Sequence, residues 1–205
     1  WAGEALVFTA TNGEYPSIFR QVPNREAPAE LHARVQDIAA SWDGRTVVFA
    51  STEDSNSGSL WKADADGRHA MQIAPGFIGT PVVTRDDRAV IFMKLDQTAW
   101  MVPIEGGTPT QITDRQTLYP DVSPDGKSLA FFRAEASEPA AIIVCDLPGC
   151  KTLKRLPPTP TITRLRWTPD GRGIAYHKDS NVWIQPLDGD RGARTVDAEG
   201  FAVNM

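Results

Sequence analysis

The stretch that decides the fold is Ser123 to Phe131, which reads Ser-Pro-Asp-Gly-Lys-Ser-Leu-Ala-Phe. Its Asp-Gly pair tolerates positive φ in a tight turn, and the apolar residues that follow are typical of a buried strand. The pattern recurs at 41–49, 84–92 and 168–176, and a weaker copy opens the chain. The aligned aromatic residues are spaced by 41, 43, 39 and 45 residues: Phe8, Phe49, Phe92, Phe131 and Tyr176. One structural unit therefore repeats along the whole chain.

A second landmark keeps the same period and lies in the next apolar segment of each unit. Its members are Phe19, Trp61, Trp100, Ile143 and Trp183. Each unit divides into four short segments rich in β-branched and aromatic residues; in one unit we expect strands at 80–84, 89–93, 100–104 and 110–113. Four-stranded antiparallel units at this period predict an all-β protein, a β-propeller in which neighbouring blades bury each other's faces.

We expect a single propeller domain over residues 1–205. The predicted blades are 1–36, 37–79, 80–118, 119–163 and 164–199, and 200–205 would supply the strand that completes the first blade and closes a five-bladed ring. The phase of the repeat supports closure, because Met205 aligns with Ser41 and Trp1 aligns with Trp42. The alternative is a segment of a larger propeller cut at a repeat boundary.

Composition excludes two classes of function. The 205 residues include 21 Lys and Arg and 26 Asp and Glu, so the net charge of −5 argues against a nucleic-acid partner. An apolar content of 41% fits a folded globular domain. No apolar run approaches the ~20 residues of a membrane helix, so we expect no membrane insertion by this segment.

The repeated core resembles the WD40-like (PD40) repeat of the TolB propeller family. Ser123 to Phe131 matches best and Thr168 to Tyr176 nearly as well, whereas Trp42 replaces the proline of the motif and Asp87 replaces its glycine. The resemblance implies a bacterial propeller used for binding. Such propellers occur as periplasmic Tol-system proteins, as extracytoplasmic sensor regions of kinases and transcription regulators, and as gating domains of prolyl-oligopeptidase-like enzymes.

We therefore expect a non-enzymatic sensor or protein-interaction propeller, periplasmic or otherwise extracytoplasmic, carried by a larger protein with a kinase, regulator or peptidase domain. The alternative is an accessory gating propeller of a prolyl-oligopeptidase-like hydrolase. A carbohydrate-acting enzyme is disfavoured, because it needs paired inward carboxylates and the first strands offer only Asp37 and Asp121. The motifs predict no catalytic residue, no metal site and no cofactor, and we interpret Asp64 and Asp66 as turn residues.

Two cysteines, Cys145 and Cys150, flank a predicted hairpin turn, Asp-Leu-Pro-Gly. A loop of this length brings the two Cβ atoms to a separation that suits a disulfide, which would indicate an oxidising compartment. The alternative is a pair of free thiols in a cytosolic protein.

One mouth of the central channel is predicted to bind a protein or a small anionic ligand. Lys94, Arg133 and Lys178 occupy equivalent positions in three adjacent blades, and Arg164 and Tyr119 begin two first strands. Together they would form a basic patch on an acidic protein. The alternative is ordinary solvated charge, paired with Asp96, Glu135 and Asp179. The tryptophans are interpreted as packing between blades: Trp42, Trp61, Trp100, Trp167 and Trp183.

Overall fold

The computed structural model describes residues 5–11, 15–24, 27–52, 58–76, 78–188 and 192–196. Within these ranges all regular structure is β-strand, in five antiparallel sheets whose strands follow one another in chain order. The first sheet holds β1 (Leu6–Thr11), β2 (Pro16–Gln21) and β3 (Ala29–His32). The second sheet holds β4 (Val35–Ala40), β5 (Thr46–Ser51), β6 (Ser59–Asp64) and β7 (Met71–Pro75).

The other three sheets have four strands each. The third holds β8 (Ile78–Val83), β9 (Ala89–Met93), β10 (Ala99–Pro103) and β11 (Thr110–Gln111). The fourth holds β12 (Leu118–Val122), β13 (Ser128–Arg133), β14 (Ala141–Asp146) and β15 (Leu153–Pro158). The fifth holds β16 (Arg164–Trp167), β17 (Gly173–Lys178), β18 (Asn181–Pro186) and β19 (Arg194–Thr195). The prediction of an all-β propeller with five blades is confirmed.

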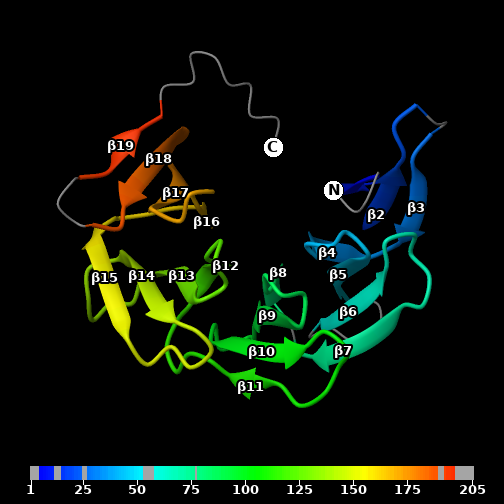
Figure 1. The fold of residues 1–205 in the computed structure, drawn as a ribbon, viewed down its shortest axis with the longest axis horizontal. Coiled ribbons are helices and arrows are strands. Elements are labelled where there is room, and N and C mark those ends of the chain that lie inside the picture. The colour runs from blue at the N-terminus through cyan, green and yellow to red at the C-terminus, as the bar shows by residue number, and fades with distance from the viewer. Residues whose placement is uncertain are drawn as a thin grey trace.

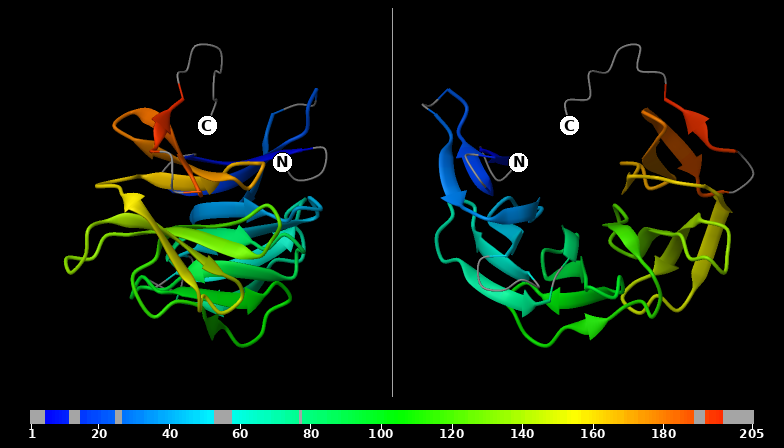
Figure 2. Two further views of the ribbon diagram at one scale, coloured as in Figure 1. Left: turned by 60° about the vertical axis from the view of Figure 1, so that its left-hand side comes forward. Right: turned by 180° about the vertical axis from the view of Figure 1, so that it is seen from behind.

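The five sheets are arranged in an arc around a central axis (Figure 1). In the second to fifth sheets the first strand lies toward the centre and the fourth lies at the periphery. The view from behind in Figure 2 shows the first and last sheets facing each other across the open side of the arc. The strand expected to close the ring, 200–205, and Trp1 lie outside the described residues.

The apolar core lies between the sheets, because the second strands β5, β9 and β13 are buried on both faces. On β9, Phe92 packs with the second sheet, whereas its neighbour Ile91 packs with the fourth, and both are fully buried. The third-strand tryptophans Trp61, Trp100 and Trp183 are partly buried against these clusters, as the repeat predicts.

A hydrogen-bonded turn joins the first and second strands of four sheets. In the fourth sheet, Ser123 Oγ donates to Asp125 Oδ1 over 2.6 Å and accepts from Ser128 N over 2.9 Å. The same carboxylate oxygen accepts from Lys127 N over 3.1 Å. Gly126 sits at φ +74°, a conformation that glycine adopts at little cost. The same hydroxyl–carboxylate pairs recur in the other three sheets: Ser41–Asp43, Thr84–Asp86 and Thr168–Asp170. The Ser or Thr hydroxyl and the Asp carboxylate of the repeated motif therefore close this turn in each of the four sheets.

Candidate ligand site at the channel mouth

A cavity of about 540 Å³ opens on the inner side of the arc. It forms where the strands β4, β8, β12 and β16 end and the turns that follow them begin. Most of its wall is apolar and includes Ile38, Val82 and Val122. Charged side chains reach it from the third, fourth and fifth sheets: Arg85, Asp121 and Arg166. A mainly apolar cavity with a few convergent polar groups is the usual form of a ligand site.

One column of the repeat supplies a cavity residue from each of four sheets. It is the position directly after the Ser or Thr of the hydrogen-bonded turn, and it holds Trp42, Arg85, Pro124 and Pro169. The hydroxyl before it and the carboxylate after it fix the turn in each sheet. These four side chains therefore reach the same mouth of the channel because the repeat places them there.

Trp42 is held in place from the neighbouring third sheet although its side chain is 57% exposed. Its backbone N–H donates to Asp87 Oδ1 over 2.6 Å, and its indole N–H donates to the Val83 carbonyl over 3.3 Å. The Arg85 guanidinium carbon lies 3.3 Å from the ring centroid, a cation–π contact. Asp87 also accepts from Asp43 N over 2.9 Å. An exposed aromatic ring is thus fixed before any ligand arrives.

Trp167 is fixed in a similar way by the fourth sheet. Its backbone N–H donates to Asp121 Oδ2 over 2.7 Å, and its indole N–H donates to the Asp121 carbonyl over 3.0 Å. Burial raises the pKa of the Asp121 carboxyl above its ordinary value, and the opposing charge of Arg166, with Nη1 3.8 Å from Oδ1, counteracts that rise. Asp121 therefore orders the Trp167 ring and supplies a negative charge to the wall of the cavity.

Arg85 has hydrogen-bonding capacity that the described residues do not use. Its Nε is buried and has no hydrogen-bond partner, and within the described ranges its guanidinium makes no hydrogen bond or ion pair. A guanidinium carries five donors in a planar fork that suits carboxylate and phosphate oxygens. The cavity thus presents an unpaired cationic donor set beside two fixed tryptophans.

No protein-family model matches the chain, and no curated protein matches it in sequence. Among solved structures, TolB from Acinetobacter baumannii aligns with a TM-score of 0.77 at 16% identity, over 95% of this chain and 52% of that protein. A putative TolB from Agrobacterium tumefaciens aligns with a TM-score of 0.69 at 15% identity, over 89% of this chain and 76% of that protein. The chain has a TolB-like β-propeller fold.

This TolB-like propeller spans about half the length of the Acinetobacter protein. Its fold is also similar to an oligogalacturonate lyase from Vibrio parahaemolyticus, with a TM-score of 0.69 at 14% identity, over 92% of this chain and 61% of the lyase. Proteins with different activities therefore share the fold, and function has to be argued from the residues of the site.

The cavity of the TolB-like propeller lies at the opposite end of the sheets from the predicted basic patch. Lys94 follows β9, and Arg133 and Lys178 end β13 and β17. Trp42 and Trp167 line the cavity, and both also contact a neighbouring sheet, as the repeat phase predicts: Trp42 bonds Val83, and Trp167 packs against the cluster between the fourth and fifth sheets. Trp42 lies in the turn after β4 and Trp167 ends β16, so each ring reaches the cavity from the interface between two sheets.

Two cations of the predicted patch, Lys94 and Lys178, contact aromatic rings of their own sheets. Lys94 Nζ lies 3.3 Å from the centroid of the Trp100 ring. Lys178 Nζ lies 5.3 Å from the Trp183 centroid and 3.8 Å from Asp179. Within the described part of the chain, no hydrogen bond, ion pair or ring contact joins these cations to one another, so their role in binding stays a prediction.

The remaining three residues of the patch have different surroundings. Arg133 is only 5% exposed, and its Nε donates to the Gln116 carbonyl over 3.1 Å. Tyr119 lies at a bulge in β12 with φ +54° and packs partly buried between the fourth and fifth sheets. Arg164 is exposed at the start of β16, opposite His177. Of these, Arg133 is placed to stabilise the fold.

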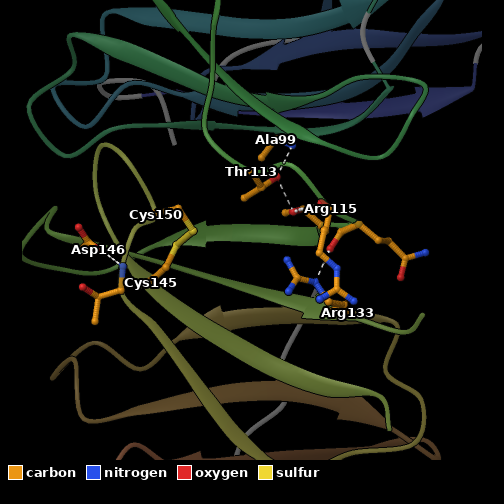
Figure 3. Close-up of a disulfide and its surroundings, with 10 residues drawn as sticks. Ala99, Thr113, Arg115, Arg133, Cys145, Asp146 and Cys150 are labelled. Atoms are coloured by element: carbon orange, nitrogen blue, oxygen red, sulfur yellow. Dashed lines mark hydrogen bonds between the residues drawn. A yellow bond between two sulfur atoms is a disulfide. The ribbon is translucent and has the colours of Figure 1, made fainter. Parts of the chain in front are cut away.

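An ion-pair network connects the third and fourth sheets beside Arg133. The Arg115 guanidinium bonds Glu135 and, over 2.9 Å, Glu138, which also accepts from Arg155 over 2.7 Å. The hydrogen bonds and charge of Arg115 lower the pKa of both glutamates. Figure 3 shows Arg115 beside Arg133. Glu135 Oε1 also lies 4.0 Å from Arg133 Nε, which is the pairing that the alternative of ordinary paired charge expects for this cation.

Cys145 and Cys150 form a disulfide across the hairpin between β14 and β15 (Figure 3). This hairpin lies at the same end of the sheets as the cavity, because Leu147 N donates to the carbonyl of Lys127, the residue before β13. The disulfide closes the hairpin between the third and fourth strands of its sheet, and its two cysteines do not line the cavity.

Other side chains with possible metal or acid–base chemistry are placed apart from the cavity. Asp64 bonds His69 over 2.7 Å, and Asp66 bonds its neighbour Arg68, so both act within an exposed turn. Asp37 does not line the cavity, whereas Asp121 does. Among the described residues, no group of three or more His, Cys, Asp and Glu side chains could hold a metal ion. In the same part of the chain, no helix has the length and apolar character needed to cross a membrane.

Two cavity residues, Trp42 and Arg85, and the Asp87 that orders Trp42 were visible in the sequence only as departures from the repeat. Trp42 replaces the motif proline, Arg85 occupies the same column, and Asp87 replaces the motif glycine. The position between the hydroxyl residue and the Asp of the turn differs among the repeats, and this variation was the signal that could have identified the mouth.

Proposed function

We propose that this chain is a non-enzymatic binding propeller, a sensor or protein-interaction module, and that the cavity at the mouth of its channel is the binding site. The observation that carries the proposal is the pair of fixed tryptophans, Trp42 and Trp167, beside an Arg85 whose donors are unused. Ordered aromatic rings and arginine are the side chains that most often dominate binding energy at interfaces.

The charged groups of the cavity favour binding over catalysis. Glycoside chemistry uses two carboxylates that face one bond, and Asp121 is the one carboxylate among the described cavity residues. That carboxylate already accepts the Trp167 backbone N–H and lies near Arg166. Its geometry supports a role in ordering the site.

We also propose an extracytoplasmic location. The support is the disulfide between Cys145 and Cys150, since such bonds persist in oxidising compartments. In the protein isolated from its source under acid quench, we expect maleimide to label both thiols only after reduction. Labelling before reduction would contradict this location. Attachment to a kinase or regulator domain, and the gating alternative, stay predictions.

Photo-cross-linking from the cavity tests the binding proposal directly. Trp42 is replaced by p-benzoylphenylalanine in the natural host, and Leu95, in the loop at the other end of the sheets, is replaced in the matched control. The two side chains have similar exposure, 57% and 64%. We expect a discrete cross-linked species from position 42 that position 95 does not yield. Identical products from both positions, or none from position 42, would overturn the proposal.

A further inference from the structure

We propose that the cavity binds a monocarboxylate whose charged group is attached to an aromatic or other apolar body. This inference rests on the proposed function, because it assigns the chemistry of the ligand at the same site. It is argued from the unpaired guanidinium, the wall of the cavity and the balance of its three charges.

The carboxylate would be held by Arg85. Among the described residues its guanidinium has no hydrogen-bond or ion-pair partner, and its buried Nε is also unpaired, so an acceptor that met its terminal N–H groups from the cavity would be stabilised. Its ring contact with Trp42 fixes the plane of the guanidinium without using its donors. A second cation, Arg166, lines the same cavity and is half exposed, with Nη1 bonded only to the Leu165 carbonyl over 3.3 Å.

The body of the ligand would lie against the apolar wall. Pro81, Pro124 and Pro169 line the cavity together with Trp42 and Trp167, and none of these side chains presents a charge. The indole N–H groups of both tryptophans are already bonded to backbone carbonyls. The rings therefore offer apolar faces and no free donor, which suits an aromatic or aliphatic group better than a sugar hydroxyl.

The charges of the wall select a single negative charge. Two arginines face one carboxylate, Asp121, which leaves one positive charge uncompensated. A doubly charged phosphate would bring one charge more than the wall can neutralise, beside a carboxylate that is already buried. Asp121 thus opposes the ligand's charge and restricts it to one.

The first experiment follows the indole N–H signals of a ¹⁵N-labelled protein during titration with phenylacetate, phenylacetamide or acetate. We expect a Kd of about 1 mM for a ligand of this size, so titrations extend to about 10 mM. We expect phenylacetate to shift the Trp42 and Trp167 signals and to leave Trp61 unmoved. Phenylacetamide, without the charge, and acetate, without the ring, should bind about 10-fold more weakly or not at all.

The variants carry a matched charge control. Arg85→Gln should weaken phenylacetate binding about 10-fold, whereas Arg45→Gln, at an exposed turn outside the cavity, should leave it unchanged. Asp121→Asn keeps an acceptor for the Trp167 N–H and should tighten binding, because it removes the opposing charge. Equal effects of Arg85→Gln and Arg45→Gln, or weaker binding by Asp121→Asn with an unchanged circular dichroism spectrum, would overturn the inference.

Two further arms separate the outcomes. A tripeptide that ends in phenylalanine with a free carboxylate, compared with its amide, shows whether the carboxylate can come from a chain terminus or only from a free acid. A specific cross-link from position 42 without any phenylacetate shift would leave the binding function in place and reject this ligand chemistry. Failure of both experiments would reject both.

Discussion

Asp87 is expected to clamp the second and third sheets together at the channel mouth. Its carboxylate accepts the backbone N–H groups of Trp42 and Asp43 over 2.6 and 2.9 Å, although it occupies the glycine position of the repeat at φ +57°. Substitution by glycine therefore has two opposing effects: it removes both hydrogen bonds, and it relieves the backbone conformation.

The relative size of these two effects decides whether Asp87→Gly raises or lowers the free energy of unfolding. Two partly solvated charge-assisted hydrogen bonds contribute about 1 kcal/mol each, and a non-glycine residue in this region costs about 1 kcal/mol. The greater freedom of glycine in the unfolded chain costs about 0.7 kcal/mol. Asp87→Gly should therefore lower the free energy of unfolding by about 1.5–2 kcal/mol. Asp87→Ala loses both hydrogen bonds and gains no relief, because the positive φ and its cost are kept, so it should lower the free energy of unfolding by about 2–2.5 kcal/mol.

Urea unfolding followed by circular dichroism measures these differences. The matched control is Asp179→Gly, because Asp179 also has a positive φ of +50° but its side chain is 78% exposed and contacts only Lys178. We expect that control to be as stable as the parent or slightly more stable. If Asp87→Gly were equally stable, the inter-sheet hydrogen bonds of Asp87 would contribute nothing and the clamp would be refuted.

Three further predictions concern the fold. Reduction of Cys145–Cys150, which are 5 residues apart, should lower the free energy of unfolding by about 2 kcal/mol, and an unchanged urea midpoint with reductant would contradict this. Phe131→Ala, at a fully buried ring, should cost about 3–5 kcal/mol in the same assay, whereas Leu95→Ala, at an exposed loop, should cost less than about 0.5 kcal/mol. Hydrogen bonds from the Ser or Thr hydroxyl lower the pKa of the four turn carboxylates. The contribution of these carboxylates to the free energy of unfolding is therefore complete above the ordinary pKa of 3.8 and is lost as the pH falls through the lowered pKa values. The four carboxylates are Asp43, Asp86, Asp125 and Asp170. Acid titration of Asp125→Asn should show a smaller loss of stability below that value than the parent; an equal loss would exclude this origin.

Local rules were sufficient to predict the strands and the turns. The expected strand at 89–93 is β9, and that at 100–104 is β10 displaced by one residue. Both follow from short-range chemistry, because a short run of apolar residues bounded by turn residues is contained within about ten residues of the chain. The pairing of Cys145 with Cys150 belongs to the same class, since one hairpin determines it.

The site could not be predicted in the same way, because its contacts run between sheets. Trp42 is ordered by Val83 and Asp87, more than 40 residues away, and Trp167 is ordered by Asp121. Arg133 looked like a surface cation but donates to the Gln116 carbonyl of the preceding connection and is nearly buried. The sequence alone predicts the position of a residue within its repeat, but it does not predict which residue of the neighbouring sheet it contacts.

The hydrogen-bonded turn separates the residues that maintain the scaffold from those that determine specificity. In four sheets the hydroxyl and the carboxylate bond to each other and to the backbone, and the residue between them is free of that task. The side chains at the mouth therefore depend on four positions, which hold Trp42, Arg85, Pro124 and Pro169. Each of these positions can be substituted without altering the residues that close the turn or fill the core. The binding specificity of the mouth can therefore change through single substitutions.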